Sequence, residues 1–259
     1  MTDCYYRRRP GDQQIFESTD LTRSNWTPDI QHGSPPLALL TKAIEEQLTG
    51  SPLRIGRLAL DILGAIPVAP LTVRAWVERP GKRICLLNSE MTPVGGARPV
   101  ARVSAWALAT SDTGDAAGDR YPPLVEGPTA ALPDQWWNVG GYLDSVDFRP
   151  QHDDPSGSRV FWLTPEVPLV DDEPTTALQR LAMVVDSANG VGSALDPQQY
   201  LFMNTDTVVH LHRLPAGDDF ALRARGSIGP DGIGVTTADV FDRDGFIGTC
   251  AQTLLVQRR

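Results

Sequence analysis

One carboxylate in the chain stands where a reactive group could meet a ligand. Asp186 belongs to the stretch 175–197, whose apolar residues recur at helical spacing and form a single stripe. Its neighbours one turn away in either direction, Ala182 and Gly190, are small, so the acid stays within reach of a ligand. A carboxylate in this position can act as a general base toward water. The alternative is a solvated acid at the edge of the stripe, which is a common arrangement.

Other catalytic patterns find no support in the sequence. There is no Gly-x-Ser-x-Gly segment, and therefore no sign of a serine nucleophile on a strand-to-helix turn. Cys4, Cys85 and Cys250 lack CxxC spacing and read as reduced thiols. His210 and His212 alternate along a predicted strand, with no carboxylate cluster at ligand spacing nearby. We expect neither a metal nor a cofactor.

The composition is that of an acidic globular protein. The 259 residues are 41% hydrophobic and carry a formal net charge of −9. Arg7–Arg9 is the one basic run, which argues against a nucleic-acid partner or an anionic membrane surface. The first residues contain no apolar signal segment, and no run reaches the roughly 18 apolar residues of a membrane span. We therefore expect a cytoplasmic location.

The predicted elements occur in the same order twice. In each half a short strand comes first, a helix follows, and four strands complete the set. The first set is predicted at 14–18, 32–48, 53–63, 71–79, 83–91 and 99–108. The second is predicted at 145–149, 160–164, 175–197, 202–214, 220–228, 234–242 and 246–256. Matching segments are offset by roughly 146–150 residues, which indicates an internal repeat.

The repeat suggests two units that share one sheet. Asp, Gly, Ala and Pro dominate the segment between them, which predicts a linker at 111–142 separating units at 1–110 and 143–259. Trp136 and Trp137 suggest that part of this linker packs on a surface. A single sheet wrapped around one helix leaves an open edge, and two such units can join edges and bury both helices.

Several segments resemble the acyl-CoA thioesterase II type, in particular its bacterial thioesterase-like branch. His32–Leu40, HGSPPLALL, is similar to the family's HGGPPAALL helix start. The other matching segments are 146–149, Phe161-Trp162, 181–190, Asp206 with His212-Arg213, and the last strand around Gln252. The resemblance covers most of the chain outside the linker. It implies an α+β fold of the double-hotdog form, with two repeats of a long helix wrapped by an antiparallel sheet.

The resemblance also implies a site in the second repeat. In that family an Asp on the second helix, a Thr or Ser on the following strand and a Gln on the last strand hold a water against the thioester. By position the Asp is Asp186 and the Gln is Gln252, while the hydroxyl position falls on Asn204, with Thr205 beside it. Neighbours on a strand face opposite sides, so only one of this pair can serve. The first repeat has Trp106 where the second has Gln252, which leaves one equipped site.

The implied function is hydrolysis of an acyl-CoA or other acyl thioester by activated water. One alternative, motivated by Asn204, is a non-catalytic protein that binds acyl-CoA. A second is an enoyl-CoA hydratase, whose family couples an Asp with a His five residues on, where this chain has Val191. His32 reads as a loop side chain at a helix start. Assembly into a homo-oligomer is left open.

Overall fold

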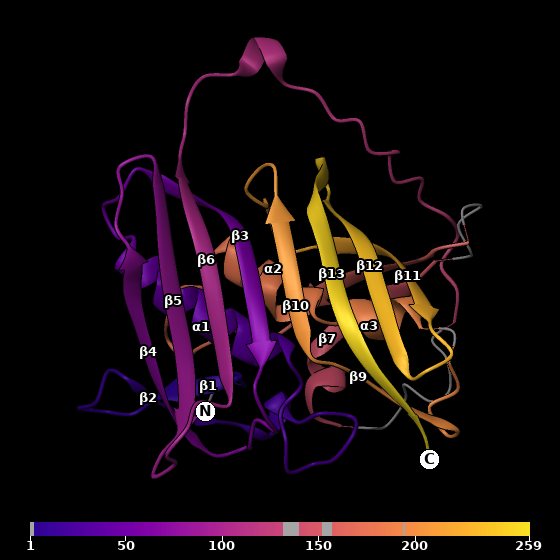
Figure 1. Ribbon diagram of the computed structural model, residues 1–259, viewed down its shortest axis with the longest axis horizontal. Helices are drawn as coiled ribbons and strands as arrows, with labels where there is room; N and C mark the ends of the chain where they lie inside the picture. The colour runs from indigo at the N-terminus through magenta and orange to yellow at the C-terminus, as the bar shows by residue number, and fades with distance from the viewer. Residues whose placement is uncertain (1–2, 132–139, 152–156, 194) are drawn as a thin grey trace.

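The protein is a broad antiparallel sheet with its helices on one side. The computed structural model describes residues 3–131, 140–151, 157–193 and 195–259. Figure 1 shows the sheet in front and the helices α1, α2 and α3 behind it. The large antiparallel sheet and the few helices agree with the predicted α+β class.

The first half of the chain supplies a hairpin, a helix and four long strands. These elements are β1 (Tyr6–Arg8), β2 (Ile15–Ser18), α1 (Ser34–Gln47), β3 (Leu53–Ile62), β4 (Pro70–Arg79), β5 (Ile84–Pro93) and β6 (Ala101–Ala109). Short 3-10 turns lie at Asp20–Thr22, Gly114–Ala116 and Gly141–Ser145.

The second half supplies its own hairpin, helices and strands. These are β7 (Val146–Pro150), β8 (Arg159–Pro165), α2 (Ala177–Val185), α3 (Ala188–Gly192), β9 (Tyr200–Asn204), β10 (Asp206–Leu211), β11 (Phe220–Ile228), β12 (Ile233–Asp242) and β13 (Gly245–Arg258).

The two halves join edge to edge in the middle of the sheet. The strand order is β1-β2-β4-β5-β6-β3-β10-β13-β12-β11-β8-β7, and β9 pairs with the end of β13. β3 and β10 form the joint, where Leu60 pairs with Thr207 and Leu58 with Val209. Pairing at this joint closes an edge that each half would otherwise expose.

The helices pack against each other in antiparallel fashion beneath the sheet. Gly33, Pro35 and Pro36 begin α1, because proline fits the first helical turn, where its missing N–H is not needed. At the start of α2 the Thr176 hydroxyl accepts a hydrogen bond from the Gln179 amide. Most apolar side chains of both helices are buried in one core with the inner face of the sheet. Within the described residues, no helix is long and apolar enough to cross a membrane.

The second helix differs from the continuous one predicted over 175–197. It begins at Ala177, breaks at Asp186 and Ser187, and ends at Gly192. At the break the Ser187 amide donates to the Val184 carbonyl, which is a tighter turn than the α-helical one. At the end of α3 a Cβ on Gly192 would lie 3.0 Å from the Arg225 backbone nitrogen, so the close approach of β11 favours glycine there.

The predicted strand 202–214 is also two strands, divided at Thr205. Asn204 pairs with Leu254, whereas Val208 pairs with Ala251. Four steps along this strand therefore match three steps along β13, which makes a β-bulge. The bulge shifts the alternation of side chains between β9 and β10 by one residue.

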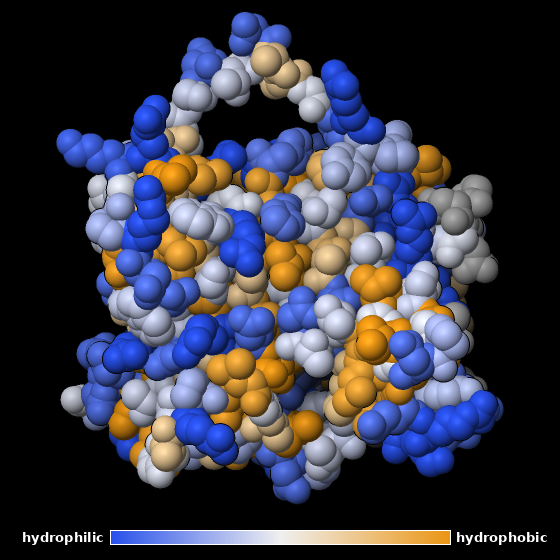
Figure 2. Space-filling view, in the orientation of Figure 1, coloured by the Kyte–Doolittle hydropathy of each residue, from blue (hydrophilic) through white to orange (hydrophobic). Residues whose placement is uncertain are grey.

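Part of the segment predicted as a linker lies on the outer face of the second half. Its first portion, around Gly114–Ala116, arches away from the body of the molecule (Figures 1 and 2). Tyr121 then stacks on Phe246 with ring centroids 3.9 Å apart, and the Arg223 guanidinium donates to the carbonyls of Pro122 and Pro123. Trp136 and Trp137, from which such packing was predicted, lie outside the described residues.

Candidate active site

Asp186 lies at the end of α2 with one carboxylate oxygen held by three donors. The residue is 4% exposed. Its Oδ1 accepts hydrogen bonds from Asn204 Nδ2 at 2.8 Å, from Gln252 Nε2 at 3.2 Å, and from the Thr207 hydroxyl. Three donors on one oxygen fix the orientation of the carboxylate.

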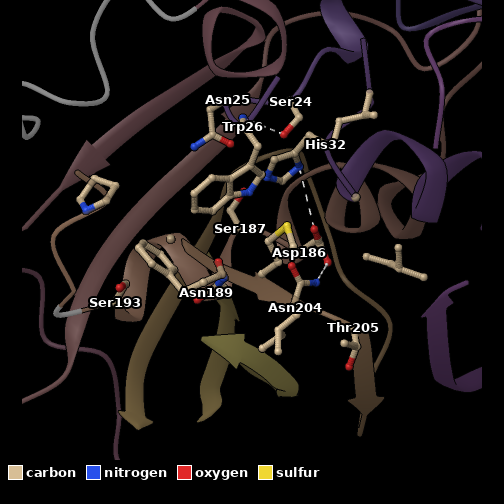
Figure 3. A pocket seen from close by; sticks show the side chains of 18 of the residues that line it. Ser24, Asn25, Trp26, His32, Asp186, Ser187, Asn189, Ser193, Asn204 and Thr205 are labelled. Carbon is tan, nitrogen blue, oxygen red and sulfur yellow. Dashed lines mark hydrogen bonds and ion pairs between the residues drawn. The ribbon is translucent and has the colours of Figure 1, made fainter. Parts of the chain in front are cut away.

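The second oxygen, Oδ2, faces the start of α1. A Cβ added to Gly33 would overlap this carboxylate, so the close approach requires glycine. His32 Nδ1 lies 3.9 Å from Oδ2. Figure 3 shows Asp186 between Asn204 on one side and His32 on the other. The N-terminus of α1 therefore adjoins the oxygen that the three donors leave free, and its amides carry partial positive charge.

His32 is held in a neutral form beside the acid. Its Nδ1 accepts a hydrogen bond from the Ser34 amide at 3.1 Å, which places the ring proton on Nε2. Burial lowers the pKa of His32, and the opposing charge of Asp186 offsets only part of that shift. The ring stacks on Tyr142, with centroids 3.9 Å apart. Tyr142 in turn donates to the Met183 carbonyl at 2.9 Å, which ties His32 to the end of α2.

The bulge between β9 and β10 explains how two strand residues reach the same carboxylate. Asn204 and Thr207 both bond Asp186, although an odd spacing normally places side chains on opposite faces. Thr205 faces away and its hydroxyl contacts Asp206 and the Thr253 carbonyl. Of the two candidates for the hydroxyl position, the structure thus brings Asn204 to the acid and leaves Thr205 outside the cluster.

Gln252 lies deeper than the other members of the cluster. It is 1% exposed, and its Nε2 also contacts the Asp186 carbonyl at 3.0 Å and the Thr207 hydroxyl at 2.9 Å. Trp106, which the sequence offset aligns with Gln252, lies on the other face of the sheet, because Ala105 and Ala107 on either side of it face the core. Trp106 and Gln252 therefore do not occupy matching positions in the two halves of the sheet.

A cavity of about 790 Å³ adjoins the cluster. Asp186, Asn204, His32 and Gly33 line it, whereas Thr207 and Gln252 are not among the described residues that do. The volume is in the range of small-molecule sites. A ligand in the cavity can therefore meet Asp186 and Asn204 directly.

The sequence does not assign three residues of the site, which are Thr207, His32 and Gly33. Thr207 was missed because the bulge cannot be read from the alternation of a single strand, although its face is shared with the apolar Val209. The sequence alone indicates a loop side chain at a helix start for His32, because the packing of α1 on α2 that brings His32 and Gly33 to Asp186 is not visible in local sequence. The sequence placed no histidine near Asp186, and the structure corrects this by bringing His32 to it.

No metal-binding group accompanies the acid. Among the described residues, no three His, Cys, Asp or Glu side chains are grouped so as to hold a metal ion. The donors around Asp186 Oδ1 are an amide, a second amide and a hydroxyl, and they already occupy the oxygen that a cation would share.

Comparisons with known proteins show the family of this chain. Residues 22–108 match the family model of the acyl-CoA thioesterase N-terminal domain, and residues 119–256 match that of the C-terminal domain. A search of curated proteins finds no significant match.

Solved structures show the fold. A candidate thioesterase from Novosphingobium aromaticivorans DSM 12444 superposes with a TM-score of 0.70 at 18% identity, covering 97% of this chain and 98% of that one. The acyl-CoA thioesterase II TesB2 from Mycobacterium marinum superposes with a TM-score of 0.67 at 14% identity, covering 97% and 94%. A protein with a hot dog fold from Alicyclobacillus acidocaldarius gives 0.67 at 14% identity, covering 95% and 94%. The fold of this chain is therefore a hotdog fold.

Proposed function

Because the chain belongs to the acyl-CoA thioesterase family, we propose that it hydrolyses acyl-CoA thioesters with a water molecule activated by Asp186. The observation that carries this proposal is the asymmetry of the carboxylate. Oδ1 is held by three donors, none of which bonds Oδ2, and Asp186 lines a cavity large enough for a substrate. A general base needs one oxygen free to accept a proton and a fixed direction in which to accept it.

The proposed reaction is a direct attack by water. Asp186 Oδ2 takes a proton from a water as its oxygen adds to the thioester carbonyl, and the carbonyl oxygen becomes an oxyanion. The first amides of α1, near Gly33, supply partial positive charge for that oxyanion. The carbon–sulfur bond then breaks, and the leaving thiolate receives the proton from Asp186. The products are a carboxylic acid and free coenzyme A thiol.

The three donors have separate parts in this scheme. Thr207 and Gln252 lie away from the cavity and hold Asp186 Oδ1, so we assign them as positioning residues. Asn204 also bonds Oδ1 but lines the cavity, where it can in addition contact the water. Asn204 is thus compatible with turnover, because the hydroxyl contact to Asp186 is made by Thr207. Thr205 has no part in the proposed reaction.

The proposal includes two hotdog units within one chain. We assign them to 1–110 and 143–259, with 111–142 as the linker. The strand order, which runs outward from β3 and β10 through a comparable series of strands, supports this division. So do the two domain matches, although the second begins at residue 119, inside the assigned linker.

Release of free thiol from acyl-CoAs of graded chain length tests the proposal. We expect turnover by the wild-type chain and its loss in Asp186→Asn, with the same thermal midpoint in both. Binding of acyl-CoA without thiol release at any chain length would favour a non-catalytic carrier instead. His32 beside Asp186 makes an enoyl-CoA the necessary control substrate, and its hydration without thiol release would favour a hydratase.

A further inference from the structure

Asn189 lines the same cavity as Asp186 and lies three residues further along the helical path. It belongs to α3, which continues from α2 after the break. The Val191 amide donates to the Ser187 carbonyl at 2.9 Å, so the chain remains helical across this stretch. Residues three apart on a helix are neighbours, with Cβ atoms about 5–6 Å apart. Figure 3 shows Asn189 next to Ser187 at the wall of the pocket.

The orientation of the Asn189 carboxamide follows from its hydrogen bond. Its Nδ2 donates to the Phe202 carbonyl at 3.1 Å. A carbonyl only accepts, so the amide nitrogen must face Phe202 and the oxygen must face elsewhere. Asn189 is 7% exposed, and its Oδ1 is buried with no hydrogen-bond partner among the described residues.

A buried acceptor without a partner is costly and rare. Leaving it unpaired destabilises a protein by about 1–3 kcal/mol, and nearly all buried polar atoms find a donor. The surroundings of Asn189 are largely apolar on one side, where Trp26 packs edge-on against Phe202 with ring centroids 5.3 Å apart. Asn189 lines the substrate cavity, so this unpaired acceptor is most simply satisfied by a donor on a bound substrate that displaces the side chains now covering it.

We infer that Asn189 Oδ1 accepts a hydrogen bond from the cysteamine amide N–H of a phosphopantetheine thioester, and that Asn189 is a specificity-determining residue for that group. The inference rests on the proposed function and names the substrate group that Asn189 recognises. In such thioesters the nearest N–H is separated from the thioester sulfur by a single ethylene bridge. Asp186 must deliver water to the thioester carbonyl. Asn189 lies one helical turn from Asp186, and this separation is comparable to the length of the ethylene bridge between the sulfur and the N–H.

A pair of substrates that differ only in this N–H tests the inference. The first is an acyl thioester of N-acetylcysteamine, and the second carries the same acyl group on N-acetyl-N-methylcysteamine, which lacks the donor. We expect wild-type kcat/KM to fall about 10-fold or more on methylation, since the Asn189 oxygen is left unpaired. In Asn189→Ala the first substrate should fall to a similar rate, and the ratio between the two should approach one.

Asn25→Ala is the matched control. Asn25 is the same residue type and lines the same cavity, but it is exposed and can be satisfied by water. It should keep the wild-type preference for the N–H substrate. A wild-type ratio near one, or an unchanged ratio in Asn189→Ala, would overturn the inference. If Asn189→Ala fails to fold, the ratio of kcat/KM between the two substrates is measured for Asn189→Ser and for the wild type. The same outcomes then support or overturn the inference.

A binding measurement distinguishes failure of this inference from failure of the proposed function. The thioether analogues of the two substrates cannot be hydrolysed, and their dissociation constants are measured by calorimetry. Tighter binding of the N–H analogue by the wild type, absent in Asn189→Ala, supports the inference even if the chain releases no thiol. Equal binding of both analogues by the wild type contradicts it, whatever the hydrolysis assay gives.

Discussion

The two ends of the α1–α2 helix pair carry acids in contrasting settings. At one end, the start of α1 meets the end of α2, and Asp186 borders a cavity. At the other end, Glu45 near the end of α1 accepts hydrogen bonds from Thr176 and Gln179 at the start of α2. Gln179 Nε2 lies 2.6 Å from Glu45, and burial raises the pKa of Glu45.

The Glu45 end is also closed by ion pairs. Arg8 from β1 and Lys42 from α1 both contact Glu173, at 2.7 and 2.9 Å. The hydrogen bond from Arg8 is the largest cause that holds the pKa of Glu173 down, to about 2. These side chains satisfy one another at the end that Glu45 occupies, whereas Asp186 lines a cavity. A carboxylate is a candidate general base when hydrogen bonds to one of its oxygens fix its orientation and the other oxygen can still accept a proton.

The inner faces of the two halves of the sheet also differ. Thr207 and Gln252 place polar atoms on the inner face of β10 and β13. The corresponding inner positions of β3 and β6 are apolar, with Leu58 opposite Ala105 and Leu60 opposite Val103. Only the second pair of strands therefore supplies donors for a carboxylate.

The largest loss of kcat should come from a variant that removes the proposed general base. Asp186→Asn keeps the shape of the side chain but cannot accept the proton, so kcat should fall about 10²- to 10⁴-fold. Thiol release from an acyl-CoA measures this, and thermal unfolding confirms that the fold is kept. Activity within a few-fold of wild type would remove Asp186 from the reaction.

Crowding the carboxylate should be nearly as damaging. In Gly33→Ala the added Cβ overlaps the Asp186 carboxylate, so either the acid or the start of α1 must move. Because misplacement by about 1 Å can cost about 100-fold, we expect a loss of that order in kcat. The control is Gly11→Ala, at a glycine with open space around its Cβ, which should affect stability but not kcat. A fully active Gly33→Ala protein would contradict the close approach of the two halves.

Loss of a positioning residue should cost less. Thr207→Val removes one of the three donors to Asp186 Oδ1 and leaves the other two, so we expect kcat to fall about 10-fold, as for one hydrogen bond to a charged group. Thr205→Val, at the division between β9 and β10, is the matched control, and it should leave kcat unchanged because Thr205 does not contact the acid. The reverse ranking of these two variants would reassign the hydroxyl position.

The order of elements and the place of Asp186 could be predicted from the sequence, because helix and strand periodicity are local. Thr207 could not, because its approach to Asp186 depends on a bulge visible only when β9 and β10 are paired with β13. His32 and Gly33 could not either, because they reach Asp186 through the packing of α1 on α2. Sequence periodicity also cannot show that Gln252 lies behind the acid instead of in the cavity.

Low pH should affect the Asp186 end through His32. Burial lowers the pKa of His32, so the unfolded chain binds its proton more readily than the folded one. Its contribution to stability therefore falls as the pH drops below about 6.5, by no more than about 1.4 kcal/mol per pH unit. Denaturant unfolding of wild type and His32→Gln across pH 5 to 7.5 should show the difference, and parallel curves would contradict it.

The smallest effect is expected at the closed end. Glu45→Gln removes the charge that burial disfavours and keeps an oxygen for Thr176 and Gln179. Because the pKa of Glu45 is raised in the folded state, its ionisation opposes folding as the pH rises through that range. We expect unchanged kcat and an equal or slightly higher thermal midpoint at pH 7. A marked loss of thiol release would mean that the two ends are not independent.

The location of a bound substrate tests the contrast between the two ends most directly. A crystal structure of Asp186→Asn with an intact acyl-CoA should place the thioester carbonyl in the cavity, with a water between it and residue 186 and the carbonyl oxygen toward the start of α1. A thioester bound instead beside Glu45 and Lys42, or in the cavity with its carbonyl beyond the reach of a water on residue 186, would contradict the account.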